Sequence, residues 1–290
     1  MSTEGLMTPV PGVEPTRGGV YLWRYSPNVG AAALFLVLFM ATFLYTTWRI
    51  WKTRTLFCIA FAVGGFMEMV GYGVRAGAHS KTGKLMPFVV QNMFILVAPV
   101  LFAASIYMTL GRLITTARGS LHSLVRPSRI TLTFVLGDVL SFVVQGAGGG
   151  MAVVQNQNLA KWSERIVVIG LLIQVIMFAL FCVLAVVFHR RMKQALGSRT
   201  NAYLPSWEGT MIMLYVVSLL IMVRSIFRVV EYCQGYTGYA LSHEWTLYVF
   251  DSLLMFAATV AFAWKFPEDV VGQPGGSEDV NMDSQQSMLK

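Results

Sequence analysis

The sequence contains little of what a soluble enzyme or a metalloprotein needs. Only 12% of its 290 residues are charged, against about 25% in an average soluble domain, whereas 56% are hydrophobic. Its four histidines lie in loops or near the ends of apolar segments, which argues against a three-histidine zinc hydrolase of the ceramidase kind and against haem held by two histidines. Its three cysteines have neither metal-ligand spacing nor an evident disulfide pairing. We therefore expect no metal site, no cofactor, no catalytic residue and no enzyme activity.

Motifs of several membrane-protein classes are missing as well. No GxxxxGK[ST] loop occurs, so we expect that any transport is driven by a gradient or is passive, or that the chain regulates another transporter. The third apolar segment ends in YMTLGR and the seventh has no NPxxY, which weakens assignment to the common class of seven-helix receptors. Met255 stands one turn after Asp251, where a retinal protein needs its Schiff-base lysine. A divergent receptor or sensor for a lipid or stress ligand remains the alternative to a transporter.

What the sequence does contain is seven apolar segments of bilayer length. They are expected at about Val29–Trp48, Leu56–Arg75, Phe88–Leu110, Ile130–Met151, Ile166–Phe188, Met211–Tyr232 and Trp245–Trp264. The fold class is therefore an all-α integral membrane protein, a seven-transmembrane helix bundle over residues 28–265. Residues 1–27 precede the bundle, and residues 266–290, with their prolines, glycines and acidic residues, are expected to be a disordered tail.

The distribution of basic residues predicts the orientation. The loops after the first, third and fifth spans hold eleven lysines and arginines. The N-terminal segment and the loops after the second and fourth spans hold seven, and the last loop holds none. By the positive-inside rule, the first group of loops and the C-terminus are cytosolic. The N-terminus and residues 1–27 are then extracellular.

Several spans carry charges, each of which costs about 2.5–3.5 kcal/mol at the centre of a bilayer on insertion scales. In four spans polar residues recur three, four and seven positions apart, so each set lies along one face of its helix. The sets are Glu68, Tyr72 and Arg75; Asp138, Ser141 and Gln145; Arg224, Arg228 and Glu231; and Glu244, Tyr248 and Asp251. Because polar stripes facing lipid are unfavourable, they predict a shared polar chamber. The chamber is expected to open to the outside, with Gln91 and Asn92 joining it and apolar packing closing it below.

Two interpretations of these charges remain open. They bind an amphipathic ligand, or they form a buried network that only fixes the packing of the helices. Arg75 and Glu244 either belong to the chamber or mark the ends of spans. Arg228 is expected to pair locally with Glu231. Arg224 is expected to pair with Asp251, because consecutive antiparallel spans are usual neighbours and the two residues lie at similar depth.

Seven stretches of the chain resemble, in order, the fungal RTA-like family of seven-helix membrane proteins, also called lipid-translocating exporters. They are YSPN (25–28), EMVGYGVR (68–75), APVLFAASIYMTLGR (98–112), DVLSFVVQGAGGG (138–150), GLLIQ (170–174), RSIFRVVEYCQGYTG (224–238) and HEWTLYVFD (243–251). The resemblance covers roughly residues 20–268. It implies a multi-pass plasma-membrane protein that translocates sphingoid long-chain bases or related toxins, or one that transports porphyrins.

A lipid-translocating exporter is thus the first functional hypothesis. A sphingoid base has a cationic amine and hydroxyl groups on a long apolar tail, so its binding site needs carboxylates and amides. The candidate ligand-binding residues, all within the matching stretches, are Glu68, Tyr72, Asp138, Gln145, Gln174, Arg224, Arg228, Glu231 and Asp251. The expected partner is a membrane lipid or an amphipathic small molecule, and not a nucleic acid.

Overall fold

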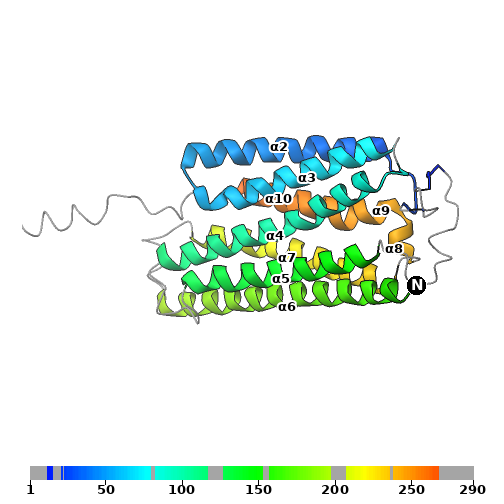
Figure 1. The fold of residues 1–290 in the computed structure, drawn as a ribbon. Coiled ribbons are helices and arrows are strands. Elements are labelled where there is room, and N and C mark those ends of the chain that lie inside the picture. Colours follow the sequence, from blue (N-terminus) through cyan, green and yellow to red (C-terminus); the bar gives the residue numbers. More distant parts are fainter. Residues whose placement is uncertain are drawn as a thin grey trace, which may run out of the picture.

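A computed structural model describes residues 12–15, 21, 23–79, 82–116, 127–152, 157–196, 207–235 and 238–267. Every regular element in these ranges is helical, and seven of the helices are long and apolar enough to cross a membrane. They lie side by side in one bundle (Figure 1). The prediction of an all-α membrane protein with seven spans is confirmed.

The helices extend further than the apolar segments predicted from sequence. The first six spans are α2 (Val29–Thr53), η1 (Leu56–Cys58) with α3 (Ile59–Ala78), α4 (Leu85–Thr116), α5 (Pro127–Ala152), α6 (Gln157–Leu196) and α7 (Trp207–Cys233). After the short α8 (Tyr239–Ser242), the seventh span combines α9 (Glu244–Leu247), the π-helical turn η4 (Tyr248–Leu253) and α10 (Leu254–Trp264). The extra length arises because hydropathy marks only the apolar part of a helix, whereas hydrogen bonding continues into polar flanks.

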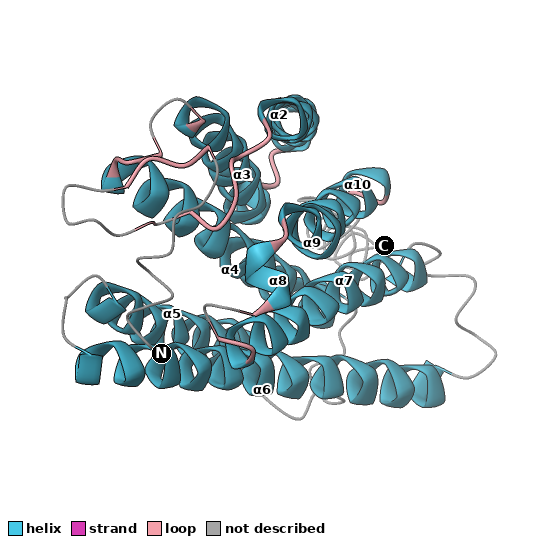
Figure 2. Cartoon of the chain, turned by 90° about the vertical axis from the view of Figure 1, so that its right-hand side faces the viewer, coloured by secondary structure: helices cyan, strands magenta, loops and turns pink. Residues whose placement is uncertain are grey.

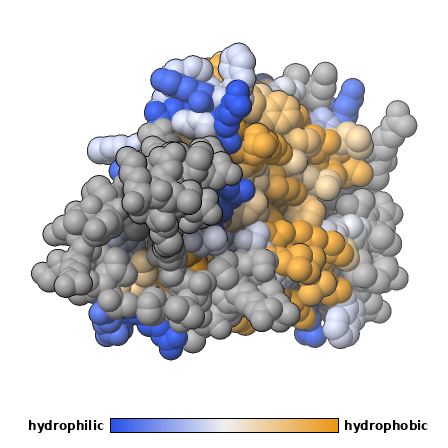
Figure 3. All heavy atoms as spheres, turned by 90° about the vertical axis from the view of Figure 1, so that its left-hand side faces the viewer, coloured by the Kyte–Doolittle hydropathy of each residue, from blue (hydrophilic) through white to orange (hydrophobic). Residues whose placement is uncertain are grey.

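Basic residues that the sequence predicts to be cytosolic gather at one end of the bundle. We call the end where α2 begins the N end, and the end where α10 stops the C end; they are right and left in Figure 1. Basic residues of the loops predicted to be cytosolic, among them Arg54, Arg112 and Arg190, lie at the C end. Figure 3 looks onto that end and shows hydrophilic residues along its margin beside a broad hydrophobic area.

Glycines allow two pairs of helices to approach closely. A Cβ atom on Gly71 of α3 would lie 2.7 Å from Cγ1 of Ile95 on α4, so only glycine fits this contact. A Cβ atom on Gly148 of α5 would lie 2.7 Å from a methyl carbon of Val167 on α6. The end-on view of Figure 2 accordingly shows α5 and α6 together at one side of the bundle, with α4 between them and the group of α2, α3 and α9.

Aromatic side chains fill the half of the bundle nearer the C end. The ring of Phe61 on α3 lies between Phe102 of α4 and Phe262 of α10, with centroid distances of 4.5 and 3.8 Å. All three side chains are buried. This packing forms the apolar floor expected beneath the polar residues.

Candidate functional site

The polar stripes of α3, α7 and η4 meet in one buried network. The carboxylate of Asp251 lies at its centre, accepting one hydrogen bond from Nε of Arg224 and another, of 2.7 Å, from Nη2 of Arg228. Arg228 also donates to Glu231 at 2.9 Å. The predicted pairs of Arg224 with Asp251 and of Arg228 with Glu231 are therefore confirmed. The additional contact between Arg228 and Asp251 arises because two arginines one turn apart on α7 present their guanidinium groups to the same carboxylate.

This network is closed to the surroundings. Arg224 also donates from Nη2 to the backbone carbonyl of Ile95 on α4, at 3.2 Å, which fixes the network to a third helix. Asp251 is 1% exposed and Arg224 2%. Buried ion pairs persist when hydrogen bonds satisfy them in this way, and removing one partner leaves an uncompensated charge.

Glu68 differs from the other charged residues of the network. Its side chain is 1% exposed, and neither carboxyl oxygen has a hydrogen-bond partner among the described residues. Asp251, Arg224 and Arg228 lie near enough to act on its charge. Their hydrogen bonds nevertheless go to one another, to Glu231 and to the backbone carbonyl of Ile95. A buried polar group without a hydrogen bond is unfavourable for folding, so the hydrogen bonds of the described residues do not explain why Glu68 is there.

A ladder of polar contacts between α3 and the seventh span leads from this network to the N end. The hydroxyl of Tyr72, one turn beyond Glu68, forms a hydrogen bond with Ser252. Arg75, one turn further, forms an ion pair of 2.7 Å with Glu244. Its Nε also donates to the hydroxyl of Tyr248 at 3.2 Å. The two stripes read from the sequence therefore face each other toward the N end, whereas no hydrogen bond joins Glu68 to Asp251 in the described residues.

Residues that precede α2 cover the outer end of this ladder. The hydroxyl of Tyr25 accepts a hydrogen bond of 3.0 Å from Arg75, whose guanidinium carbon lies 5.5 Å from the ring centre of Trp23. Glu244 accepts from the backbone N–H of Asn28 at 3.0 Å. Burial raises the pKa of Tyr25 above its ordinary value, so this group remains a neutral phenol. Arg75 is 1% exposed and belongs to the polar site rather than marking the end of a span.

Three of the predicted site residues lie in a different region, between α4, α5 and α6. One oxygen of Asp138 accepts a hydrogen bond of 2.8 Å from the hydroxyl of Tyr107. Gln145 donates to Gln174 at 3.1 Å. Among the described residues, no hydrogen bond or ion pair joins these groups to Arg224 or Asp251. The prediction of a single chamber shared by four stripes is therefore wrong, because α5 packs on α4 and α6 and α4 separates it from the seventh span (Figure 2).

The predicted site residues are packed together rather than lining an open space. None of the nine candidate ligand-binding side chains is more than 9% exposed. The structure therefore shows a closed arrangement, and a ligand reaches these groups only when helices separate. In the described ranges, no three histidine, cysteine, aspartate or glutamate side chains are grouped so as to hold a metal ion.

The π-helical turn η4 is a site feature that the sequence did not reveal. It carries Asp251 and Ser252, and the hydroxyl of Ser252 donates to the backbone carbonyl of Leu247, five residues earlier, at 3.3 Å. Isolated π-helical turns occur frequently at functional sites. The wider turn brings both residues inward, Asp251 toward α7 and Ser252 toward α3. Nothing in the composition of YVFDSL distinguishes it from ordinary helix.

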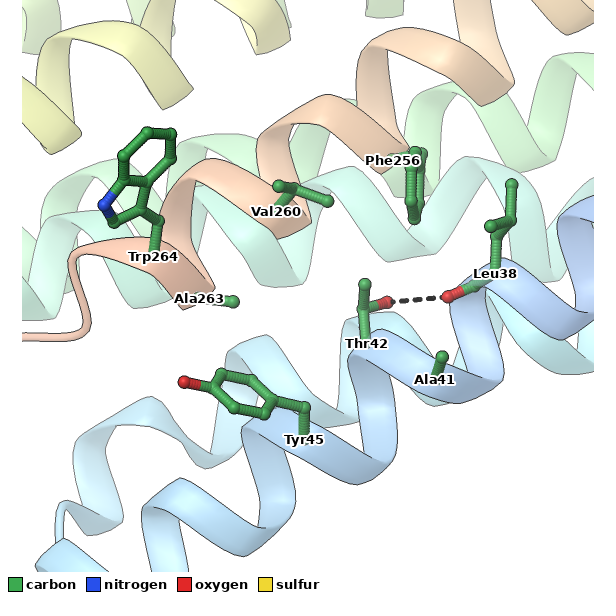
Figure 4. Close-up of a pocket in the computed structure, with 8 residues that line it drawn as sticks. All are labelled: Leu38, Ala41, Thr42, Tyr45, Phe256, Val260, Ala263 and Trp264. Carbon is green, nitrogen blue, oxygen red and sulfur yellow. Dashed lines mark hydrogen bonds between the residues drawn. The ribbon is translucent and has the colours of Figure 1, made fainter.

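A lipid-facing groove of about 320 Å³ lies between α2 and α10 (Figure 4). It is lined by Leu38, Ala41, Thr42, Tyr45, Phe256, Val260, Ala263 and Trp264. Phe256 meets Phe39 edge to face at 6.1 Å between ring centres, and Phe39 stacks on Tyr72 at 5.5 Å. These rings separate the groove from the polar ladder.

Comparisons with known proteins agree with the resemblance seen in the sequence. Residues 61–274 match the family described as RTA1 like protein. Protein RTA1 of Saccharomyces cerevisiae is 36% identical, covering 87% of this chain and 86% of the relative. Protoporphyrin uptake protein 1 of the same yeast is 32% identical, with 86% and 92% covered. Sphingoid long-chain base transporter RSB1, also of this yeast, is 27% identical, with 70% and 62% covered. No solved structure matches the chain.

Proposed function

The chain belongs to the RTA1-like family of multi-pass membrane proteins, and we propose that it moves single-chain amphipathic amines of the sphingoid long-chain base type across the plasma membrane. Transport without a catalytic step is its proposed activity. One relative is named a transporter of such bases. The observation that carries the proposal is Glu68, a buried carboxyl group that receives no hydrogen bond from any described residue. An ammonium group is the complementary partner for it, since hydrogen bonds between opposite charges are the strong ones.

The surroundings of Glu68 suit an amphipathic amine better than an anion. Among the described residues, Arg224 and Arg228 are already in ion pairs with carboxylates, although Nε of Arg228 has no hydrogen-bond partner. The charge of Glu68 is therefore the one in the network that no ion pair balances. The hydroxyls of Tyr72 and Ser252 lie one turn nearer the N end, where they are placed to meet the hydroxyl groups of the ligand. The ring of Phe39 packs on Tyr72 and offers an apolar wall for the chain of the lipid.

A transport experiment tests this proposal. Cells expressing the wild-type chain are loaded with labelled sphinganine, and its release is compared with release from cells expressing Glu68→Gln or Asp138→Asn. Glutamine keeps the shape of Glu68 without its charge, so release should fall at least about tenfold, equivalent to about 1.4 kcal/mol, at unchanged protein abundance. Asp138→Asn keeps the acceptor for Tyr107 and should stay within about twofold. Undiminished release by Glu68→Gln would show that this carboxyl does not bind the amine.

The proposed orientation places the N end outside the cell and the C end in the cytosol. Residues 1–27 are then extracellular, residues 28–265 form the membrane domain, and residues 266–290 are cytosolic. In a variant without the three natural cysteines, Gln234→Cys at the N end should react with an impermeant maleimide in intact cells. Arg54→Cys at the C end should react only after permeabilisation; both positions are exposed. The opposite labelling pattern would invert the orientation.

Porphyrin transport is a second candidate, favoured by one comparison. The protoporphyrin uptake relative is 32% identical over 92% of its length, against 27% over 62% for the sphingoid base transporter. The carboxylates of protoporphyrin would need Arg224 or Arg228, which must first release their present partners. Uptake of added protoporphyrin that survives Glu68→Gln but is lost in Arg228→Gln, at equal abundance, would favour this candidate.

A further inference from the structure

The charges around Glu68 balance without it. Arg224 and Arg228 contribute two positive charges, and Asp251 and Glu231 two negative ones, all joined by ion pairs. The buried phenol of Tyr72, which is bonded to Ser252, also lies near Glu68. An ordinary phenol is neutral at neutral pH. An ionised Glu68 would therefore add an unbalanced charge inside the bilayer, without a hydrogen bond from a described residue to stabilise it. The group is neutral only when it holds a proton or pairs with a cation.

We infer that Glu68 is a one-for-one exchange site at which a proton and a cationic amine compete for the same carboxyl group; this inference rests on the proposed function. When the ammonium group of the ligand arrives, the carboxyl group releases its proton to water and the resulting carboxylate pairs with the ammonium. When the amine leaves, a proton from water returns. The site has no net charge in either state, so neither state leaves an uncompensated charge in the membrane.

Competition for one carboxyl group would couple the two ions. A carrier whose single site must hold either a proton or an amine moves one of them outward for each one that it moves inward. A proton gradient then drives the amine against its own gradient without ATP, in agreement with the absence of a GxxxxGK[ST] loop from the sequence. The other charged groups of the network are held in ion pairs. Glu68 is therefore the group left to exchange a proton for the amine.

The polar ladder provides the route between Glu68 and the N end. The hydroxyls of Tyr72 and Ser252 form its first step, and the hydroxyl of Tyr248, which donates to Glu244 at 3.2 Å, forms the next. Hydroxyl groups both donate and accept hydrogen bonds, so these groups are able to pass a proton onward once water or a movement of the helices joins them. In the closed structure no hydrogen bond among the described residues joins Glu68 to this ladder. The larger amine needs the ion pair of Arg75 and Glu244 to open, which explains why the closed structure buries the site.

The test measures proton release when the purified full-length protein, in lipid nanodiscs, binds sphinganine. The medium is lightly buffered, contains a pH indicator, and is kept well below the pH at which the amine of sphinganine loses its own proton. We expect about one proton released per molecule bound, and an apparent Kd that tightens about tenfold for each unit of rising pH, as competition with one proton requires. N-acetylsphinganine, which has no charged amine, should release none.

Two matched variants identify the group that responds. Glu68→Gln should bind sphinganine at least about tenfold more weakly, release no proton and lose the pH dependence. Asp138→Asn, which changes a second buried carboxyl group outside the network, should keep all three properties of the wild type. If Glu68→Gln does not fold, Glu68→Asp keeps a titratable carboxyl group at a shifted position, so it should still release a proton but with a changed pH dependence of binding. A pH dependence identical to that of the wild type would overturn the inference.

The outcomes separate the exchange from the function on which it rests. Sphinganine that binds the wild type without releasing a proton, and with equal affinity at every pH, would overturn the exchange while the proposed function stands. Proton release that persists in Glu68→Gln would assign the exchange to another group and overturn the inference. No binding of sphinganine by the wild type would overturn both.

Discussion

The two buried polar regions of this bundle treat their carboxyl groups in opposite ways. Between α4, α5 and α6, Asp138 receives a hydrogen bond from Tyr107 at one of its two oxygens, and Gln145 pairs with Gln174. Between α3, α7 and η4, ion pairs join the buried charged groups of α7 and η4 to one another, while both oxygens of Glu68 have no hydrogen-bond partner among the described residues.

Burial therefore does not distinguish the two regions, because Glu68 and Asp138 are each 1% exposed. Their partners do. A pair of neutral amides, or a carboxyl group held by a phenol, links neighbouring helices and has a direct structural use. An unsatisfied carboxyl group weakens the fold by the free energy of its lost hydration. The unsatisfied carboxyl group of Glu68 thus indicates a partner that binds and dissociates, whereas the hydrogen bond to Asp138 indicates fixed packing.

The largest effect should come from removing the centre of the charged region. Asp251→Ala leaves Arg224 and Arg228 without their shared carboxylate, and the loss of stability should be about 3–5 kcal/mol. Arg224→Ala should also destabilise the protein, and the double variant should recover part of the loss. Unfolding midpoints in mild detergent measure these changes. Strictly additive losses would show that the two residues do not interact, and the charged region would then lose its proposed centre.

The comparison also shows which parts of the site could be predicted from the sequence. Glu231 lies three residues after Arg228, so their pairing follows from helical periodicity alone. Counting residues inward from the ends of the last two spans placed Arg224 and Asp251 at one depth, and the structure joins them. Both steps use only local geometry and the rule that consecutive antiparallel spans are neighbours.

Other features needed information that no single helix carries. Periodicity placed Asp138 and Gln145 on one face of α5 but did not say that this face meets α4 and α6 rather than α3 and α7. The π-helical turn at Asp251 has no compositional signature. Arg75 was left between two interpretations because its partners Tyr25 and Glu244 lie on distant parts of the chain. Which helix faces pack together is decided by the whole bundle.

An intermediate effect should follow from making the second region resemble the first. Tyr107→Phe removes the only described hydrogen-bond donor to Asp138 and leaves a buried carboxyl group unsatisfied, as Glu68 is. The free energy of unfolding should fall by about 1–3 kcal/mol. Sphinganine release should stay close to that of the wild type, because the substitution lies outside the charged region. A loss of release with unchanged stability would show that Asp138 also takes part in transport.

A smaller effect is expected at the outer end of the ladder. Glu244→Gln keeps an oxygen acceptor for Arg75 and for the backbone N–H of Asn28, but it removes the charge. Because Glu244 is 16% exposed, the loss of stability should be about 1 kcal/mol or less. Because the substitution weakens a contact that keeps the structure closed, sphinganine release should be unchanged or up to about threefold faster. A threefold change in rate corresponds to less than about 1 kcal/mol, which is within the range given for the loss of stability. Abolished release would instead make Glu244 a group that binds the ligand.

The smallest effect should come from replacing the amide pair of the second region as a whole. Gln145→Leu or Gln174→Leu alone leaves the other amide unsatisfied and should cost about 1–3 kcal/mol of stability. The double variant removes donor and acceptor together and should come within about 1 kcal/mol of the wild type, because a buried hydrogen-bonded pair exchanged for apolar contact is nearly neutral. Sphinganine release by the double variant should also be preserved. If release is lost while the melting temperature is unchanged, the two amides contact the ligand, and the division of the bundle into a functional and a structural polar region fails.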